Sequence, residues 1–266
     1  MTRLTGLLAM GRQQGFAVLM KHVRLVALRR FHHFCFDRRY EAIESVPTGG
    51  YLLQDDLDPA DPGNLSQARE YLPSPRLVVN WLLQGLGEEY SDFSFVDFGS
   101  GRGRVLLAAA EKPFRNVLGV EFSTRLHNEA ERNIADYPRE RLKSGTVRSV
   151  CMDAARFDLP DGDCILYFFN PFGAELLERV IERSLDQAGA GTRRIIVILY
   201  NPVHLETVAA NPRLRLRPMS YVDQMKMRVF SPYPAAIFDF VDGATNSMNP
   251  GKTGHLQPRR EFVGSV

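Results

Sequence analysis

The stretch FVDFGSGRGRVL, residues 95–106, decides the fold of this chain. Residues compatible with a β-strand run into a glycine-dense turn, and an apolar run suited to a helix, residues 105–110, follows the turn. The order strand, turn, helix places backbone N–H groups at a helix N-terminus, where they and the helix dipole can receive an anionic or polar nucleotide-like ligand. The alternative is a plain tight connection between a strand and a helix.

Composition indicates an ordinary globular protein with no strong preference for a charged partner. The 266 residues suit one large α/β domain with additions, and 44% hydrophobic with 24% charged residues is typical of that class. A net charge of +2 is too small to indicate a nucleic-acid partner. Three separated cysteines indicate free thiols in a reducing compartment, so we expect a cytoplasmic protein.

Four apolar runs after the turn each end in polar residues. They cover residues 116–121, 146–153, 163–169 and 195–200. Parallel strands buried on both faces have such continuous apolar sequences, and their carboxyl ends meet at one edge of the sheet, where ligands bind. The sequence therefore predicts a doubly wound, mostly parallel α/β sheet with a site at that edge.

The glycine spacing distinguishes between two kinds of nucleotide site. A dinucleotide fingerprint, G-x-G-x-x-G, would need a third glycine at position 104, where this chain has Arg104. The pattern Asp97-x-Gly99-x-Gly101-x-Gly103 instead resembles motif I of the class I S-adenosylmethionine (SAM)-dependent methyltransferases. The resemblance implies a seven-stranded sheet, with the turn, Ser100 included, around the methionine part of SAM and Asp97 close by.

Two further acids lie at the ends of the second and third strands. The distance of Glu121 from the turn along the sequence suits a carboxylate that accepts hydrogen bonds from both ribose hydroxyls. Glu121 also resembles the motif II acid of the same family. Its alternative role is to cap the next helix, which Ser123 would do better. Asp153 and Ala154 resemble the residues that contact adenine, and the alternative is a solvated acid at a strand end.

The fourth strand ends in Asn170-Pro171-Phe172. The sequence resembles the D/N/S-P-P-Y/F motif that holds the target nitrogen in amino-group methyltransferases, although the second proline is missing. Asn170 and Phe172 are therefore the candidate catalytic residues, and a plain turn with Pro171 fixing φ is the alternative. His204, after the fifth strand, is a further candidate base or an ordinary loop histidine.

The segment Tyr71-Leu72-Pro73-Ser74-Pro75 lies just before an apolar helix, residues 77–86. Ser74 would cap that helix, with Pro75 at its first position. The segment also resembles one that borders the SAM pocket in some class I methyltransferases, which implies that Tyr71 and Ser74 lie beside the cofactor.

Residues 1–70 form an N-terminal extension whose first 40 residues carry many cations and one acid, Asp37. Apolar residues recur there at helical spacing: Phe16, Leu19, Met20, Val23, Val26, Ala27, Phe31 and Phe34. We expect this stripe to pack on the main domain; the alternatives are an anionic membrane surface or a nucleic acid. An acidic cluster in residues 55–61 lacks the EF-hand spacing, so we expect a solvated loop and no metal.

The remaining chain is expected to close and then leave the sheet. Residues 213–222 and 235–241 would form a hairpin, with residues 224–234 as a loop, and residues 242–266 would be a disordered tail. The methyltransferase domain would span residues 71–241.

The resemblance implies a SAM-dependent methyltransferase with an unidentified acceptor, an amino nitrogen of a protein or small molecule being one candidate. An NAD- or nucleotide-dependent oxidoreductase has a similar layout, but Arg104 argues against it. A non-catalytic SAM-binding protein that uses the basic helix to bind a partner is the other alternative.

Overall fold

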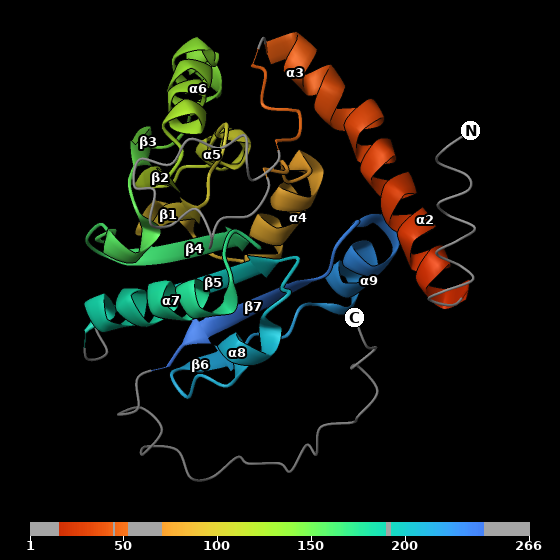
Figure 1. Cartoon of the computed structure of the whole chain (residues 1–266). Coiled ribbons are helices and arrows are strands. Elements are labelled where there is room, and N and C mark those ends of the chain that lie inside the picture. Colours follow the sequence, from red (N-terminus) through yellow and green to blue (C-terminus); the bar gives the residue numbers. More distant parts are fainter. Residues whose placement is uncertain (1–15, 45, 53–70, 190–192, 242–266) are drawn as a thin grey trace.

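The computed structural model describes residues 16–44, 46–52, 71–189 and 193–241. Within these ranges a seven-stranded sheet forms the centre of the molecule (Figure 1). Its strands are β1 (Phe93–Phe98), β2 (Asn116–Glu121), β3 (Thr146–Cys151), β4 (Asp163–Phe169), β5 (Ile195–Tyr200), β6 (Leu214–Leu216) and β7 (Ala235–Phe240).

The helices surround the sheet and include a long N-terminal one at the edge of the molecule (Figure 1). They are α2 (Phe16–His32), α3 (Arg38–Glu44), α4 (Arg76–Leu86), α5 (Arg104–Ala110), α6 (Thr124–Asp136), α7 (Ala174–Ala188), α8 (Leu205–Ala209) and α9 (Tyr221–Phe230). A π-helical segment, His33–Asp37, joins α2 to α3.

The strand order is β3-β2-β1-β4-β5-β7-β6, with β1 to β5 parallel and β7 antiparallel to both β5 and β6. This confirms the predicted doubly wound, mostly parallel sheet. Because β1 lies between β2 and β4, the direction in which the chain adds strands reverses there. In open α/β sheets a crevice forms beyond the carboxyl ends of the strands at such a reversal.

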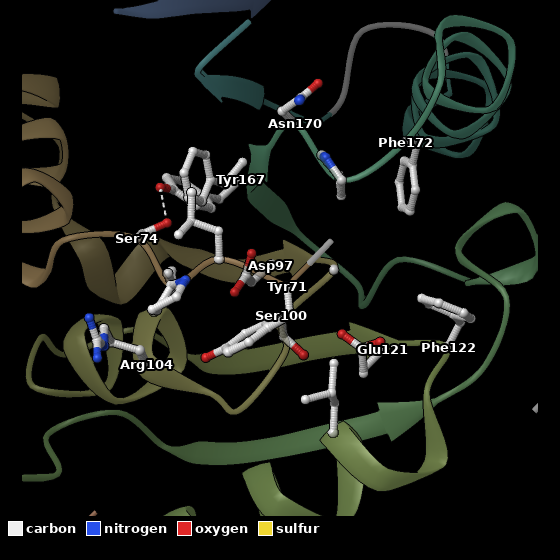
Figure 2. A pocket seen from close by; sticks show the side chains of 17 residues that line it. Tyr71, Ser74, Asp97, Ser100, Arg104, Glu121, Phe122, Tyr167, Asn170 and Phe172 are labelled. Carbon is white, nitrogen blue, oxygen red and sulfur yellow. Dashed lines mark hydrogen bonds between the residues drawn. The ribbon is translucent and has the colours of Figure 1, made fainter. Parts of the chain in front are cut away.

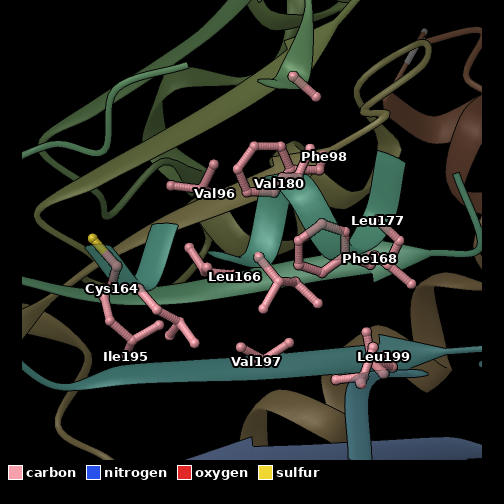
Figure 3. Packing of buried hydrophobic residues seen from close by; sticks show 14 of the residues in the cluster. Val96, Phe98, Cys164, Leu166, Phe168, Leu177, Val180, Ile195, Val197 and Leu199 are labelled. Carbon is pink, nitrogen blue, oxygen red and sulfur yellow. The ribbon is translucent and has the colours of Figure 1, made fainter. Parts of the chain in front are cut away.

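The sheet buries both faces, which explains its continuous apolar strands. Residues alternate between faces along each strand. Val96, Leu166 and Val197 point to one side, where Leu177 and Val180 of α7 cover them (Figure 3). The other side packs against α4, α5 and α9, through a second cluster that includes Phe95, Ile165, Val78, Leu106 and Met227.

Two local predictions are wrong. Most of the segment predicted as a loop between β6 and β7 is the helix α9, which begins where the Ser220 hydroxyl accepts a hydrogen bond from the Asp223 N–H at 3.1 Å. The predicted pairing with β7 is present, but β6 covers only Leu214–Leu216 of the predicted 213–222, and residues 221 and 222 already belong to α9. Ser74 does not cap α4, because its hydroxyl is instead hydrogen-bonded to the Tyr167 hydroxyl at 2.9 Å.

The N-terminal helix α2 docks on the main domain as expected, but through polar side chains and not through the apolar stripe. Arg24 donates to the backbone carbonyls of Arg228 and Ser231, and the His32 ring is hydrogen-bonded to the Phe230 carbonyl. The predicted packing of the apolar stripe on the domain is wrong, since Phe16, Met20, Val23, Phe31 and Phe34 are all exposed. Two polar side chains that reach backbone carbonyls fix this orientation, and apolar residues occur around the whole of α2, so periodicity alone could not select the buried side.

Arg104 fastens the N-terminal extension to the main domain. It is the first residue of α5, and its buried guanidinium lies 3.1 Å from the Asp37 carboxylate and contacts the Glu41 carboxylate. Its Nε also donates to the Thr48 hydroxyl at 3.0 Å. The residue that replaces the third glycine of a dinucleotide site is thus a structural anchor whose charge is neutralised by two acids.

The acidic cluster of residues 55–61 and the tail beyond residue 241 lie outside the described residues. Among those the structure describes, no helix is long and apolar enough to cross a membrane. The three cysteines are free thiols, Cys164 buried, Cys151 half-buried and Cys35 exposed.

We predict that Arg104→Met lowers the free energy of unfolding by about 3–5 kcal/mol, because it leaves the carboxylates of Asp37 and Glu41 without their cation. Urea denaturation followed by circular dichroism measures the change. Arg183→Met is the matched control: Arg183 pairs with Asp158 in solvent, and exposed pairs contribute only about 0–1 kcal/mol. Equal losses in the two variants would contradict the anchoring role of Arg104.

Candidate active site

The turn after β1 is built from glycines because side chains and backbone approach it on several sides. Gly99, Gly101 and Gly103 all have positive φ, at 81°, 53° and 83°. A Cβ on Gly99 would lie 2.7 Å from Cβ of Pro171, and one on Gly101 would lie 2.1 Å from the Tyr71 ring. The turn therefore packs closely against both the end of β4 and the segment that precedes α4.

The backbone N–H groups of the turn are already hydrogen-bonded, contrary to the expectation of unpaired donors. Gly99 and Ser100 donate to the Val120 carbonyl at 2.8 and 3.3 Å, and Gly103 donates to the Ser100 carbonyl at 2.9 Å. Gly101 donates to Oε2 of Glu121 at 2.7 Å. A turn arranged in this way has few donors left for a pyrophosphate.

Glu121 connects the turn to the end of β2. Its other carboxylate oxygen, Oε1, accepts from the Ser123 N–H at 3.0 Å, and the side chain is buried. Ser123 itself caps α6 by accepting from the Leu126 N–H, as predicted. Through its two oxygens the Glu121 carboxylate thus binds backbone N–H groups from both the turn and the start of α6.

Asp97 places a second buried carboxylate beside Glu121. Burial, and then the negative charge of Glu121, raise the pKa of Asp97 well above the ordinary value of an aspartate. Among the described residues no hydrogen-bond donor reaches the Asp97 side chain. The two acids make the site favourable for a cation and unfavourable for an anion.

The cavity at the sheet reversal brings most of the predicted residues together (Figure 2). Its lining is Tyr71, Leu72, Pro73, Ser74, Asp97, Gly99, Ser100, Arg104, Val105, Glu121, Phe122, Leu126, Tyr167, Phe169, Asn170, Pro171 and Phe172. Tyr71 is held over the turn because its hydroxyl donates to the Thr48 carbonyl at 2.7 Å. The buried Ser100 hydroxyl has no hydrogen-bond partner within the part of the chain that the structure describes. Gly101 and Gly103 shape the turn without lining the cavity.

A second, smaller hollow continues from this cavity and contains the other predicted cofactor residues. It is lined by Gly99, Val120, Phe122, Met152, Asp153, Ala154, Phe172 and Leu176. Figure 2 shows Phe122 and Phe172 on the same side of the site, beyond Glu121. Asp153 caps the short turn that follows it by accepting from the Ala155 N–H at 2.9 Å through Oδ1, which leaves Oδ2 available to a ligand.

Asn170 lies at the opposite rim, above Tyr167 in Figure 2. Its φ of 44° is in the left-handed region. Asn201, which directly follows the neighbouring strand β5 and also precedes a proline, has a φ of 53°. Asn170, Asn201 and His204 line one further small hollow, where the buried Nε2 of His204 has no partner among the described residues. The role of His204 stays a prediction.

Sequence reasoning missed several lining residues. Phe122 lines both the main cavity and the smaller hollow. It directly follows Glu121, so its position as an aromatic residue just after a strand end could have indicated that it lines the site. Tyr167 lies inside an apolar strand, and nothing in the sequence indicated that its hydroxyl would meet Ser74 across the cavity.

Among known proteins, similarity to this chain is found only with solved structures. No family model matches the sequence, and no curated protein matches it. An RNA methyltransferase from Salinibacter ruber in complex with S-adenosylhomocysteine is 18% identical, with a TM-score of 0.41 over 64% of this chain and 92% of that one. The magnesium protoporphyrin IX methyltransferase from Synechocystis, with bound SAM, is 16% identical, with a TM-score of 0.41 over 62% and 76%.

A third similar structure is the geranyl diphosphate C-methyltransferase from Streptomyces coelicolor, which is 17% identical with a TM-score of 0.40 over 61% of this chain and 79% of that one. The assignment of the fold follows from the sheet itself, through its strand order, its antiparallel β7 and the glycine turn after β1. The chain therefore has the class I methyltransferase fold.

Proposed function

We propose that this protein is a SAM-dependent methyltransferase that transfers the methyl group to an amino nitrogen. The observation that carries the proposal is the electrostatic character of the site: the N–H groups of the turn are largely taken, and two buried carboxylates, Asp97 and Glu121, lie together. SAM carries a sulfonium and an ammonium group, whereas the pyrophosphate of NAD is anionic. Two carboxylates favour the first ligand over the second.

The shape of the cavity supports the same assignment. We place the methionine part over the turn between Tyr71 and Ser100, with Asp97 near its ammonium group, and the ribose hydroxyls on Glu121. The adenine would then enter the hollow between Phe122 and Phe172, with its amino group towards Asp153 and the backbone of Ala154. Phe172 thus contacts the cofactor in this proposal, and Asn170 alone faces the acceptor.

SAM supplies an activated methyl group, so this chain's residues have to align the acceptor and exclude water. Phe169 and Pro171 provide apolar walls at the end of the cavity near Asn170, and Ser74 and Tyr167 add a hydrogen-bonded pair of hydroxyl groups to the lining. Positioning of this kind accounts for much of the rate in a reaction with an activated donor. Asn170, whose amide oxygen can accept a hydrogen bond from an amine, would orient the acceptor's lone pair.

The charges in the cavity also limit the acceptor. Its charged lining residues are Asp97, Glu121 and Arg104, and the arginine is neutralised by Asp37 and Glu41. No uncompensated cation for a phosphate group lines the cavity within the described residues. An amine of a protein or a small molecule therefore fits better than the backbone of a nucleic acid.

We predict that the protein binds SAM and S-adenosylhomocysteine and binds NAD much more weakly. Glu121→Gln should weaken SAM binding by about 1.5–3 kcal/mol, the scale of a hydrogen bond to a charged group. Glu131→Gln is a matched control, because Glu131 also accepts a backbone N–H, from Ser149, outside the cavity. Titration calorimetry measures all three; tighter binding of NAD than of SAM would refute the assignment.

We predict that Asp97→Asn raises the melting temperature of the ligand-free protein near neutral pH and at the same time weakens SAM binding. A raised carboxyl pKa in the folded state means that stability falls as the pH rises from the unfolded to the folded pKa, and the asparagine variant lacks this loss. A cationic ligand lowers the pKa of Asp97 again, so SAM affinity should increase with pH over the same window. Calorimetry at several pH values, together with thermal scans, tests both effects; a melting temperature that falls in the variant would contradict the electrostatic account.

We predict that Asn170→Gly lowers turnover about tenfold or more, while SAM affinity stays within about threefold, because the lost contact is made to the acceptor. Asn201→Gly is the matched control: it removes the same side chain at another positive φ, beside Asn170 but outside the main cavity. Transfer of tritiated methyl groups to cell-extract fractions identifies a working acceptor. Equal loss of turnover in both variants, or parallel loss of SAM affinity in the first, would remove Asn170 from the acceptor site.

A further inference from the structure

The exposed side of α2 carries a continuous apolar row. Phe16, Met20, Val23, Ala27 and Phe31 recur every three or four residues, and all five are exposed, Phe16 at 74% and Met20 at 48%. This spacing places them on one side of the helix along about 22 Å. In Figure 1, α2 runs along the edge of the molecule with α9 beside part of it, away from the sheet.

The row is not the side by which α2 is attached. Arg24 and His32 make the hydrogen bonds to the end of α9, and His32 also packs edge-on against Trp81 of α4. These contacts hold the helix in place while the apolar row remains uncovered within the described part of the chain. A large exposed apolar row on a fixed helix is a feature of interaction surfaces.

The charges beside this row identify the kind of partner. Within the described residues 16–36 there are four lysines and arginines and no acid. The first acid, Asp37, is buried against Arg104. Arg30 is exposed on the same helix, and the charge of Arg24 is met by backbone carbonyls, which do not neutralise it.

We propose that α2 binds the surface of an anionic lipid bilayer, with its apolar row in the acyl boundary and its cations at the headgroups. Interfacial helices combine these two features. A second copy of the chain fits less well, because pairing two such rows would bring the cations of both helices together without an acid. A nucleic acid would meet the cations but would leave the phenylalanine, methionine and valine side chains in water. The proposal does not depend on methyl transfer.

The test is co-sedimentation of the full-length protein with vesicles made of equal parts phosphatidylcholine and phosphatidylglycerol, compared with vesicles of phosphatidylcholine alone. We expect at least about tenfold stronger binding to the anionic vesicles, weakening with added salt. The double variant Phe16→Ser, Met20→Ser should lose about tenfold or more of this binding, and Arg30→Gln about fivefold. The matched control is Leu216→Ser, which removes an exposed apolar side chain, 60% exposed, from the edge strand β6.

Loss of vesicle binding in the α2 variants and not in the Leu216 variant supports the proposal, provided that their melting temperatures stay unchanged. Three results would overturn it: no binding to anionic vesicles, equal binding to both kinds of vesicle, or equal loss in the control. Concentration-dependent dimerisation of the protein that the α2 variants abolish, without vesicle binding, would also overturn it and would assign the row to a second copy. Failure here leaves SAM binding untouched, so the two proposals can be separated.

Discussion

The hydrogen bond from the Gly101 N–H to the Glu121 carboxylate is the contact on which the rest of the site depends. It ties the turn after β1 to the end of β2 and occupies a donor that would otherwise be open to an anion. The bond also fixes Glu121 beside Asp97, which gives the cavity its negative character. The same turn sequence with its donors free would suit a phosphate, and this bond, together with those that Gly99, Ser100 and Gly103 donate to backbone carbonyls, leaves the turn less suited to an anion.

The sequence predicts most of the fold because its strands are buried on both faces. The runs at residues 93–98, 116–121, 163–169 and 195–200 are dense in apolar residues, and the glycine turn fixes the first crossover. The helix α9 could not be found in the same way. Several of its apolar residues, Tyr221, Met225 and Val229, are exposed. The segment therefore lacks the buried apolar stripe by which an amphipathic helix is recognised in a sequence.

The site was predictable in position but not in its internal hydrogen bonds. Asp97, Glu121, Asp153 and Asn170 lie in or just after the carboxyl ends of β-strands, and parallel strands gather those ends at one edge, so their proximity follows from topology. Which donors they meet depends on side chains from distant segments. Ser74 has the character of a helix cap in the sequence, yet it meets Tyr167, because β4 places that hydroxyl against the segment before α4.

The two buried carboxylates show why a ligand site need not be a stable arrangement by itself. Asp97 is desolvated next to Glu121, and a folded protein selected for stability alone would replace it with a neutral residue of similar size. In the proposed complex with SAM, the positive charge of the ligand would offset this repulsion, so binding would recover free energy that the ligand-free fold gives up. Arg104 also lines the cavity, but its charge is paired with Asp37 and Glu41. The N-terminal extension therefore contributes to the electrostatics of the site, because its two acids pair with an arginine that lines the cavity.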